Sequence, residues 1–517
     1  MGLSLVNLEV LYLNYNRLTG DIPTSINNAS QLMAIELSRN SFTGSIPNFG
    51  NLKQLHVLRL NDNNLTGAES PNQQLEFLSS LTNCPYLLRL EIGNNGMMNG
   101  ILPASIGNLS TSVISFRASN CSIRGIIPPG VGNLINLQVL ELANNRLTGF
   151  IPTTIGNLEG LVRLYLYNNR LEWGIIPTTF GARCSLQSLN LNRNKLEGAL
   201  PRSLSNCRSL QLLNFGNNRI QDTFPVWTGN LTYLRVLILA SNNFSGTISS
   251  LTSKATLPFP NLQVFDISHN EFTGNLPNEY LRDFKAMIDA SVNHRGEEDQ
   301  SPFYTDSLIL TVKGLNLSYG TILTTFSTID MSSNRFSGSI PTSIGNLNSL
   351  MYLNLSHNCL TGNIPASFGN VTELESLDLS ANRLEGEIPT ELTKLTFLAM
   401  INLSMNNLSG KIPQSNGQFS TFENTSYVGN SGLCGFPLTR KCEEPSPPVM
   451  LQEDGYDDYG ILDGFCWQAV VSGYGFGFVI SCVILGYGRP KWFVEWVYRF
   501  YRINMRSRRG DVAPQRS

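Results

Sequence analysis

Few side chains of this 517-residue chain have a spacing that suggests covalent chemistry. It contains four histidines, and no cysteine lies at zinc-binding distance in sequence from any of them. His269 and His357 each precede an asparagine of the repeat described below, and we expect them to be solvated surface residues. No nucleophile, base and orienting partner can be assembled from the sequence. We therefore predict no enzyme, no metal and no cofactor.

Asparagine is the polar residue with a regular spacing, and its chemistry is hydrogen bonding. It recurs about every 24 residues in the frame L-x-x-L-x-L-x-x-N-x-L-x-G-x-I-P, and Cys121 holds the same position once. A short side chain there can satisfy backbone groups where a strand ends, since an unpaired buried amide costs about 1–3 kcal/mol. The asparagines of this ladder are Asn16, Asn40, Asn63, Asn95, Asn145, Asn169, Asn194, Asn218, Asn242, Asn270, Asn334, Asn358, Asn382 and Asn406.

The leucines around each asparagine do not fit an amphipathic helix. Leu377 and Leu379 show a period of two, and the breaker Gly386-x-Ile388-Pro389 follows them. A fixed period of this length is the signature of a leucine-rich-repeat solenoid. We predict an α/β solenoid: a superhelix of about fifteen 24-residue repeats with a concave parallel sheet.

The period is interrupted between Asn270 and Asn334, which are 64 residues apart. We interpret the excess as an island that folds back over the solenoid. The predicted divisions are repeats at 1–277, an island at 278–325, four further repeats at 326–413 and a cap at 414–442.

The C-terminal part changes composition three times. Residues 443–463 carry seven acidic and no basic side chains, residues 464–488 are uncharged, and residues 489–517 are rich in arginine. The uncharged stretch would make about 37 Å of helix, enough for a hydrocarbon core of about 30 Å. We predict one transmembrane helix with the basic tail in the cytosol, and helix pairing through Gly473, Gly477 and Ser481. The overall net charge of −2 gives no general attraction to nucleic acid.

Cysteines and glycosylation acceptors favour an oxidising compartment. Cys434 and Cys442 lie just after the last repeat, where a short disulfide loop would close the cap. Cys84 and Cys207 replace leucine in Asn-Cys-x-x-Leu, so we expect them to act as small apolar residues. Twelve Asn-x-Ser/Thr acceptors occur, of which Asn354 and Asn402 fall on the concave face. They are Asn28, Asn64, Asn108, Asn120, Asn230, Asn243, Asn316, Asn354, Asn370, Asn402, Asn407 and Asn424.

Ligand binding is expected on the concave face, at the strand positions that alternate with the leucines. Tyrosine and arginine carry much of the binding energy in protein interfaces. The candidate patch is Arg163, Tyr165, Tyr167, Asn190, Asn192 and Arg193. Every solenoid has polar residues at such positions, so this choice rests on residue types alone.

From about Cys184 to the basic tail the chain resembles plant receptor-like proteins, which have leucine-rich repeats, one membrane span and no kinase. The resemblance is carried by Asn206-Cys207-Arg-Ser-Leu, Asn218-Arg-Ile-Gln-Asp-Thr-Phe-Pro225, Phe419-Ser-Thr-Phe422 and Gly432-Leu-Cys-Gly-Phe-Pro437. It implies a protein, peptide or glycan ligand, a co-receptor kinase at the repeats from Asn334 to Asn406, and an adaptor kinase at the glycine-rich span. It also implies a plasma-membrane location with the repeats outside.

Residues 3–177 resemble the ectodomains of kinase-bearing receptors instead, and near Trp173 the frame gains a residue. We hypothesise a join of two receptor types between Gly174 and Cys184. Met1 enters mid-repeat with no secretion signal, so a truncated N-terminus or a defective product is expected. The alternatives to a receptor are a defective or decoy fragment and an extracellular inhibitor of a microbial enzyme.

Overall fold

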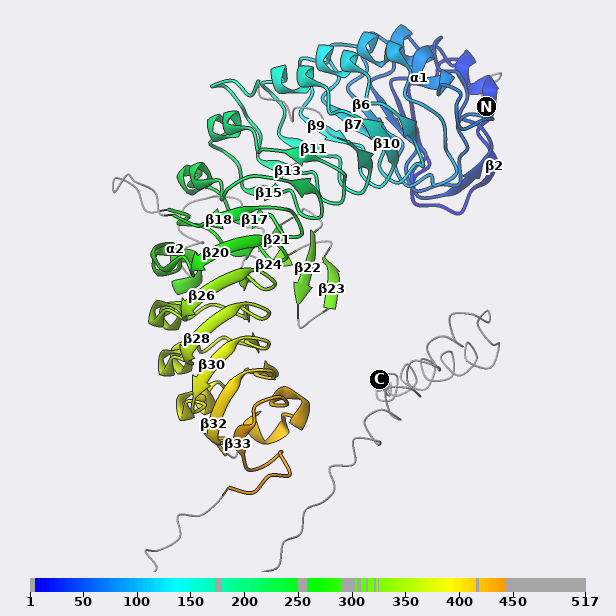
Figure 1. Cartoon of the computed structure of the whole chain (residues 1–517). Coiled ribbons are helices and arrows are strands. Elements are labelled where there is room, and N and C mark those ends of the chain that lie inside the picture. Colours follow the sequence, from blue (N-terminus) through cyan, green and yellow to red (C-terminus); the bar gives the residue numbers. More distant parts are fainter. Residues whose placement is uncertain are drawn as a thin grey trace, which may run out of the picture. The chain divides into compact units, whose positions relative to one another are not determined.

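The computed structural model describes residues 5–172, 179–249, 258–289, 325–414 and 418–442, together with the backbone of four short strands between 303 and 323. Residues 1–443 form one compact unit (Figure 1). The predicted transmembrane helix, the acidic stretch and the basic tail lie outside the described residues. Among the described residues, no helix is both long and apolar enough to cross a membrane.

A parallel sheet of fifteen short strands runs through residues 1–443, one strand for each coil. Within each strand the central residue is apolar and buried, as Leu164 and Leu377 are, because alternate residues point to opposite faces. The predicted leucine-rich-repeat solenoid with a parallel sheet is therefore confirmed. In order, its strands are β1 (Val10–Tyr12), β3 (Ala34–Glu36), β5 (Val57–Arg59), β6 (Arg89–Glu91), β7 (Ser115–Arg117), β9 (Val139–Glu141), β11 (Arg163–Tyr165), β13 (Ser188–Asn190), β15 (Leu212–Asn214), β17 (Val236–Ile238), β19 (Val264–Asp266), β25 (Thr328–Asp330), β27 (Tyr352–Asn354), β29 (Ser376–Asp378) and β31 (Met400–Asn402).

Smaller parallel sheets follow most of the ladder positions. Many of their strands contain a glycine, such as Gly149 (φ 71°), in a backbone conformation that residues with a side chain disfavour. The strands are β2 (Thr19–Asp21) with β4 (Ser41–Thr43); β8 (Arg124–Gly125), β10 (Arg146–Gly149) and β12 (Arg170–Leu171); β14 (Glu197–Gly198) with β16 (Arg219–Ile220); and β18 (Ser245–Thr247), β20 (Glu271–Asn275), β26 (Arg335–Ser339), β28 (Cys359–Asn363), β30 (Arg383–Gly386), β32 (Asn407–Lys411) and β33 (Gly432–Cys434).

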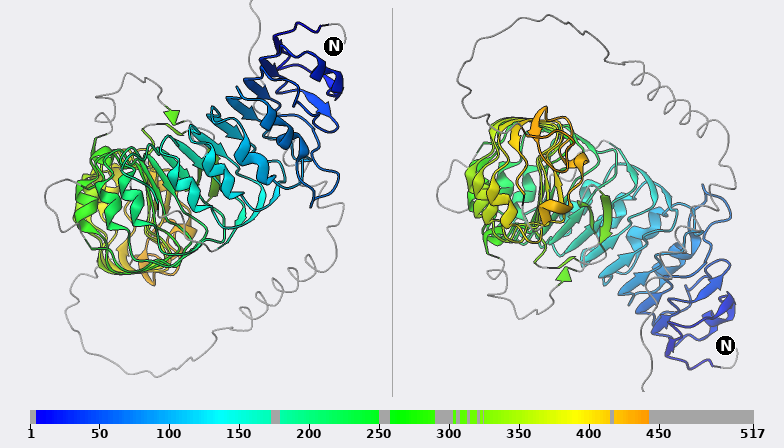
Figure 2. Two further views of the ribbon diagram at one scale, coloured as in Figure 1. Left: turned by 90° about the horizontal axis from the view of Figure 1, so that it is seen from above. Right: turned by 90° about the horizontal axis from the view of Figure 1, so that it is seen from below.

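The opposite, convex side carries short helices, and Figure 2 shows them stacked coil on coil. Proline precedes nine of the 3-10 helices, since its fixed φ suits a helix start and it needs no backbone donor there. These nine are η1 (Thr24–Asn28), η3 (Ala104–Asn108), η4 (Pro129–Asn133), η5 (Thr153–Asn157), η6 (Arg202–Asn206), η7 (Val226–Asn230), η9 (Thr342–Asn346), η10 (Ala366–Asn370) and η11 (Thr390–Lys394). The others are α1 (Glu76–Ser80), η2 (Leu81–Asn83), α2 (Asn278–Asp283), α3 (Lys285–Ile288), η12 (Gln418–Thr421) and η13 (Asn424–Ser426).

The asparagine ladder joins each coil to the one before it. The Asn358 amide nitrogen donates to the Leu355 carbonyl of its own coil at 3.1 Å and to the Met331 carbonyl of the preceding coil at 3.0 Å. Its amide oxygen accepts the backbone N–H of Phe336 at 3.0 Å. Cys121 keeps part of this pattern, because its thiol donates to the Ile92 carbonyl at 3.2 Å.

The solenoid continues across the long interruption. Strand β19 pairs directly with β25, so Asp266 lies opposite Asp330 although 63 residues separate them in the sequence. The beginning of the predicted island belongs to the convex layer: α2 buries Tyr280 and Leu281, α3 buries Ala286 and Met287, and the Ser343 hydroxyl donates to Asn278. Further along, β22 (Leu308–Val312) and β23 (Leu315–Tyr319) form an antiparallel hairpin, and β21 (Phe303–Tyr304) pairs with β24 (Ile322–Leu323).

The cysteines depart from expectation at one position. Cys434 and Cys442 form a disulfide in the cap, as predicted. Cys207 does not act as an isolated apolar residue, because it is bonded to Cys184 of the preceding coil. Cys84 is a buried free thiol, and burial raises its pKa to about 11.

The ladder also extends beyond Asn406 to Asn430, whose amide oxygen accepts the Leu408 N–H at 3.0 Å.

Replacing Asn358 by alanine is expected to destabilise the folded chain by about 2 kcal/mol, because buried backbone groups of two coils lose their partners. The measurement is the urea midpoint, together with hydrogen exchange at the Phe336 amide. Asn16→Ala is the matched control, since Asn16 is exposed. Equal shifts in the two variants would contradict the structural role of the buried amide.

Candidate ligand-binding surface

The N-terminal part of the concave face is occupied by charges that neutralise one another. The Arg59 guanidinium pairs with Glu36 at 2.7 Å and with Glu91 at 3.3 Å. In the following coils Arg117 pairs with Glu141 at 3.6 Å. A ligand bound here would have to break these pairs, so this sector is poorly suited to recognition.

The predicted patch begins at β11, where this charged row ends. Tyr165 and Tyr167 are half-buried with their ring centres 6.4 Å apart, and the Tyr165 hydroxyl donates to the Ser188 hydroxyl at 3.0 Å. Arg163 precedes them on the same face, and Arg193 is exposed one coil further. These four residues present aromatic and cationic surface on neighbouring coils.

Asn190 and Asn192 were predicted as ligand contacts, but the structure buries both, with 4% and 6% of their surface exposed. The Asn190 amide oxygen accepts the Asn192 N–H at 3.2 Å, and the Asn192 amide oxygen accepts the Asn217 side chain at 3.0 Å. Next to them, Asn214 is fully buried and its side-chain nitrogen has no hydrogen-bond partner. These asparagines therefore form a buried polar row on the strands next to the tyrosines.

On β15, β17 and β19 several concave positions are apolar and buried. Leu212, Val236, Ile238 and Val264 alternate with the core residues of their strands, yet each is at most 4% exposed. Strand positions that face away from the core are normally solvated in an open solenoid. This part of the concave face is therefore closed to solvent.

Beyond this apolar stretch, acidic and amide side chains alternate across the strands. The Asn354 amide donates to Asp330 at 3.2 Å, and the Asn402 amide donates to Asp378 at 3.2 Å. The junction of β19 and β25 breaks the alternation, because Asp266 lies opposite Asp330. Burial, and secondarily the charge of Asp330, raises the pKa of Asp266 to about 7, and burial also raises the pKa of Asp330.

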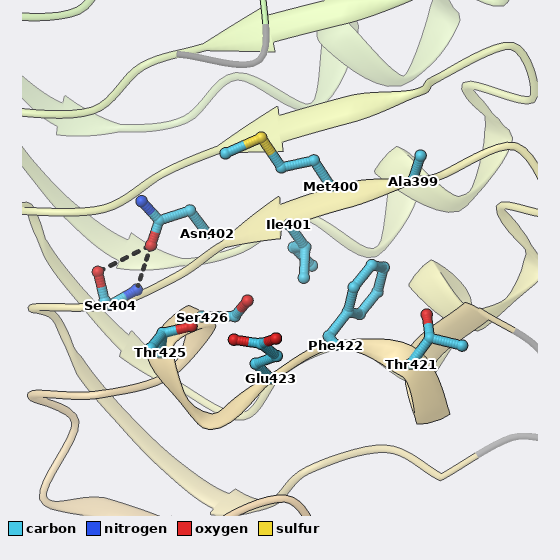
Figure 3. Close-up of a pocket in the computed structure, with 10 residues that line it drawn as sticks. All are labelled: Ala399, Met400, Ile401, Asn402, Ser404, Thr421, Phe422, Glu423, Thr425 and Ser426. Carbon is cyan, nitrogen blue, oxygen red and sulfur yellow. Dashed lines mark hydrogen bonds between the residues drawn. The ribbon is translucent and has the colours of Figure 1, made fainter. Parts of the chain in front are cut away.

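A hollow of about 360 Å³ lies where the last strand meets the cap (Figure 3). Met400 and Asn402 line it from β31 and Ser404 from just after this strand, while Glu423 and Ser426 line it from the cap. The Asn402 amide oxygen accepts the Ser404 hydroxyl at 2.8 Å, so this side chain is already engaged. The hollow ends the concave face at its C-terminal edge.

The glycosylation acceptors separate into two groups. Asn354 and Asn402 are half-buried and use their side-chain amides in the acid–amide row. The other acceptors with described side chains are exposed, whereas the side chain of Asn316 lies outside the described residues. The exposed acceptors are Asn28, Asn64, Asn108, Asn120, Asn230, Asn243, Asn370, Asn407 and Asn424. Gly473, Gly477 and Ser481 also lie outside the described residues.

Comparison with known proteins agrees with this architecture. Leucine-rich-repeat family models match residues 184–244 and 325–384, and also 7–29, 136–158 and 261–281. The chain is 51% identical to receptor like protein 22 of Arabidopsis thaliana over 283 residues, which is 53% of this chain and 36% of that protein. The homologues of this chain are plant receptor-like proteins. The chain spans about a third of the length of the first such relatives, at 36% and 34%.

The solved structures similar to this chain include ectodomains of plant receptor kinases. The ectodomain of GASSHO1/SCHENGEN3 from Arabidopsis thaliana, in complex with CASPARIAN STRIP INTEGRITY FACTOR 2, is 30% identical with a TM-score of 0.61, covering 85% of this chain and 52% of that one. The Arabidopsis receptor kinase HAESA, in complex with the peptide hormone IDA and the co-receptor SERK1, is 29% identical with a TM-score of 0.56, covering 84% and 76%. The repeats of this chain therefore have the fold of these ectodomains.

Sequence reasoning missed three features of this surface. Asp266 and Asp330 are far apart in sequence. They become equivalent positions of adjacent coils only when the residues of the interruption are left out of the repeat count. Cys184 lies 23 residues before Cys207, close to one coil period, which was an available signal. Asn430 lies 24 residues after Asn406, but Tyr427 and Leu433 replace the usual leucine frame around it.

Asp266→Asn is expected to stabilise the chain at neutral pH and to change little at pH 4. When an aspartate has a raised pKa in the folded state, the folded chain loses stability as the pH rises from the unfolded-state pKa near 4 to the folded-state pKa of about 7. The reason is that ionisation is disfavoured in the folded state. Asparagine at position 266 would give Asp330 a neutral amide neighbour, as Asn354 already is for Asp330 and Asn402 is for Asp378. We expect a gain of about 2 kcal/mol at pH 8, measured by denaturant unfolding at several pH values.

The matched control is Asp378→Asn, which removes an acid that already has an amide partner. It is expected to give no pH-dependent gain. The role assigned to the Asp266 and Asp330 pair would be wrong if both variants shifted the pH profile equally.

Proposed function

We propose that this chain is a cell-surface receptor-like protein that binds an extracellular ligand through its concave face and signals through partner receptor kinases. The observation that carries the proposal is its homology to receptor-like proteins together with its similarity to the peptide-bound ectodomain of HAESA. Arg163, Tyr165, Tyr167 and Arg193 form the proposed ligand contact.

The island is proposed to limit this surface on its C-terminal side. Leu212, Val236, Ile238 and Val264 form one buried cluster with Phe326, which lies just before β25 at the end of the interruption. A ligand would then lie on β11 and β13, with the island at its edge.

Attachment and signalling are proposed for the C-terminal parts of the chain. Residues 464–488 would cross the plasma membrane with the repeats outside, and Gly473, Gly477 and Ser481 would pair with the helix of an adaptor kinase. The four repeats at 326–413 would contact a co-receptor kinase. The HAESA complex contains the co-receptor SERK1, which supports such an assembly. The half-buried Asn354 and Asn402 favour a face free of glycans there.

The receptor proposal is tested by expressing the chain in plant cells behind an added secretion signal. We expect plasma-membrane arrival, a mass shift on glycosidase treatment and co-purification of receptor kinases. A triple Gly473→Leu, Gly477→Leu, Ser481→Leu variant should arrive equally well but lose the adaptor kinase. Retention in the endoplasmic reticulum would favour a defective fragment, and release into the medium would favour a soluble inhibitor.

The ligand patch is tested with the secreted repeats on a panel of synthetic peptides. The double variant Tyr165→Ala with Tyr167→Ala is expected to bind the captured peptides with an affinity lower by tenfold or more. Two aromatic anchors are lost, each worth about 1–2 kcal/mol of binding free energy. Tyr233→Ala is the control, because Tyr233 is exposed away from the patch, with 52% of its surface accessible. Equal binding by all three proteins would place the contact elsewhere.

A further inference from the structure

A polar hollow of about 530 Å³ lies beside the concave face, where three strands turn into the second sheet. Asn120, Asn144 and Asn168 line it from the left-handed turn position, with φ between 53° and 56°. Asparagine tolerates this conformation better than most residues. Arg146 and Arg170 line the same hollow from the position after the ladder residue.

The equivalent cations of the following coils are neutralised by neighbours. Lys195 lies 3.8 Å from the Glu172 carboxylate, and Arg219 lies 3.3 Å from the Glu197 carboxylate. Arg146 has Arg124 as its partner in the paired strands β10 and β8, and Arg170 lies opposite Thr148. In the part of the chain that the structure describes, no carboxylate pairs with Arg124, Arg146 or Arg170.

The pairing of Arg146 with Arg124 is itself unfavourable, because like charges directly opposite in adjacent strands destabilise a sheet. Arginine stays charged at every physiological pH, so the repulsion cannot be relieved by losing a proton. Arg146 lines the hollow and Arg124 does not, so an anion in the hollow would offset the charge of Arg146. Arg146 and Arg170, which have no carboxylate partner among the described residues, therefore point to a negatively charged ligand.

We propose that this hollow binds a carboxylated oligosaccharide. Arg146 and Arg170 follow equivalent ladder positions of neighbouring coils, but Arg170 lies opposite Thr148, so the two cations are staggered along the paired strands. A polymer of uronic acids carries one carboxylate on every ring and hydroxyls between them, which suits two arginines that are interspersed with side-chain amides. An acidic peptide shares the carboxylates but lacks the ring hydroxyls.

This site is distinct from the proposed concave contact and does not depend on the receptor role. Asn120 is a predicted glycosylation acceptor, and a glycan there would occupy one end of the hollow. Ser122→Ala removes the acceptor signal and keeps Asn120, so all proteins in the test carry it. Binding is then measured on the purified full-length chain, whatever its behaviour in cells.

The test is titration with a galacturonate oligomer, its fully methyl-esterified form and an oligoglutamate of equal charge. We expect saturable binding of the galacturonate oligomer that weakens with added salt and is absent for the ester. Arg146→Gln with Arg170→Gln should weaken it by about tenfold, because two charge contacts at a partly exposed site are lost. The control, Lys195→Gln with Arg219→Gln, removes two cations that already have partners and should change the affinity by less than about twofold.

Circular dichroism should show the same spectrum for the parent and both double variants. The proposal is overturned if no binding is observed, if the ester binds equally well, or if both double variants weaken binding to the same extent. Tighter binding of oligoglutamate would overturn it in favour of an acidic peptide.

Discussion

The side-chain amide of asparagine is the interaction on which this solenoid depends. At most coils the amide satisfies carbonyl groups of two coils and accepts an N–H from the preceding one, and at many of them it is buried. Apolar packing of the leucines supplies most of the driving force for folding, but it is not directional. The amide fixes the rise from one coil to the next, and therefore the register of every side chain on the concave face.

This fixed register explains why the two ends of the concave face differ in chemistry. Once the coils are aligned, Glu36, Arg59 and Glu91 must lie side by side, and their charges cancel. The same alignment brings Asp266 against Asp330 in a buried place, where burial raises the pKa of both carboxyls and the charge of Asp330 raises that of Asp266 further. Between these sectors, Tyr165 and Tyr167 stand at the transition from charged to closed surface. Residue types alone are ambiguous at such positions, because their neighbours decide whether they are available to a ligand.

Much of the fold could be predicted because its information is periodic. Leucine at alternate positions, asparagine at the strand end and proline before the short helix each recur in nearly every coil. The burial of Asn190 and Asn192 could not be predicted in this way, since alternation places them on the concave face but does not say what lies above them. The bond between Cys184 and Cys207 was missed for a related reason: Cys207 was compared with leucine at the same repeat position rather than with its spatial neighbour. The paired aspartates required knowing that β19 and β25 are adjacent.

The continuity of β19 and β25 across 61 intervening residues has a consequence for how such a chain changes through evolution. Every ladder bond joins equivalent positions of adjacent coils, so a gain or loss of one complete coil leaves all the remaining bonds able to form. An insertion is tolerated for the same reason, provided that the chain re-enters the solenoid at the repeat position where the next complete coil would have begun. A change of half a coil would leave carbonyl and amide groups without partners. Unequal recombination can therefore lengthen, shorten or splice this protein in whole units, and each event moves the binding residues by one step without altering the backbone that carries them.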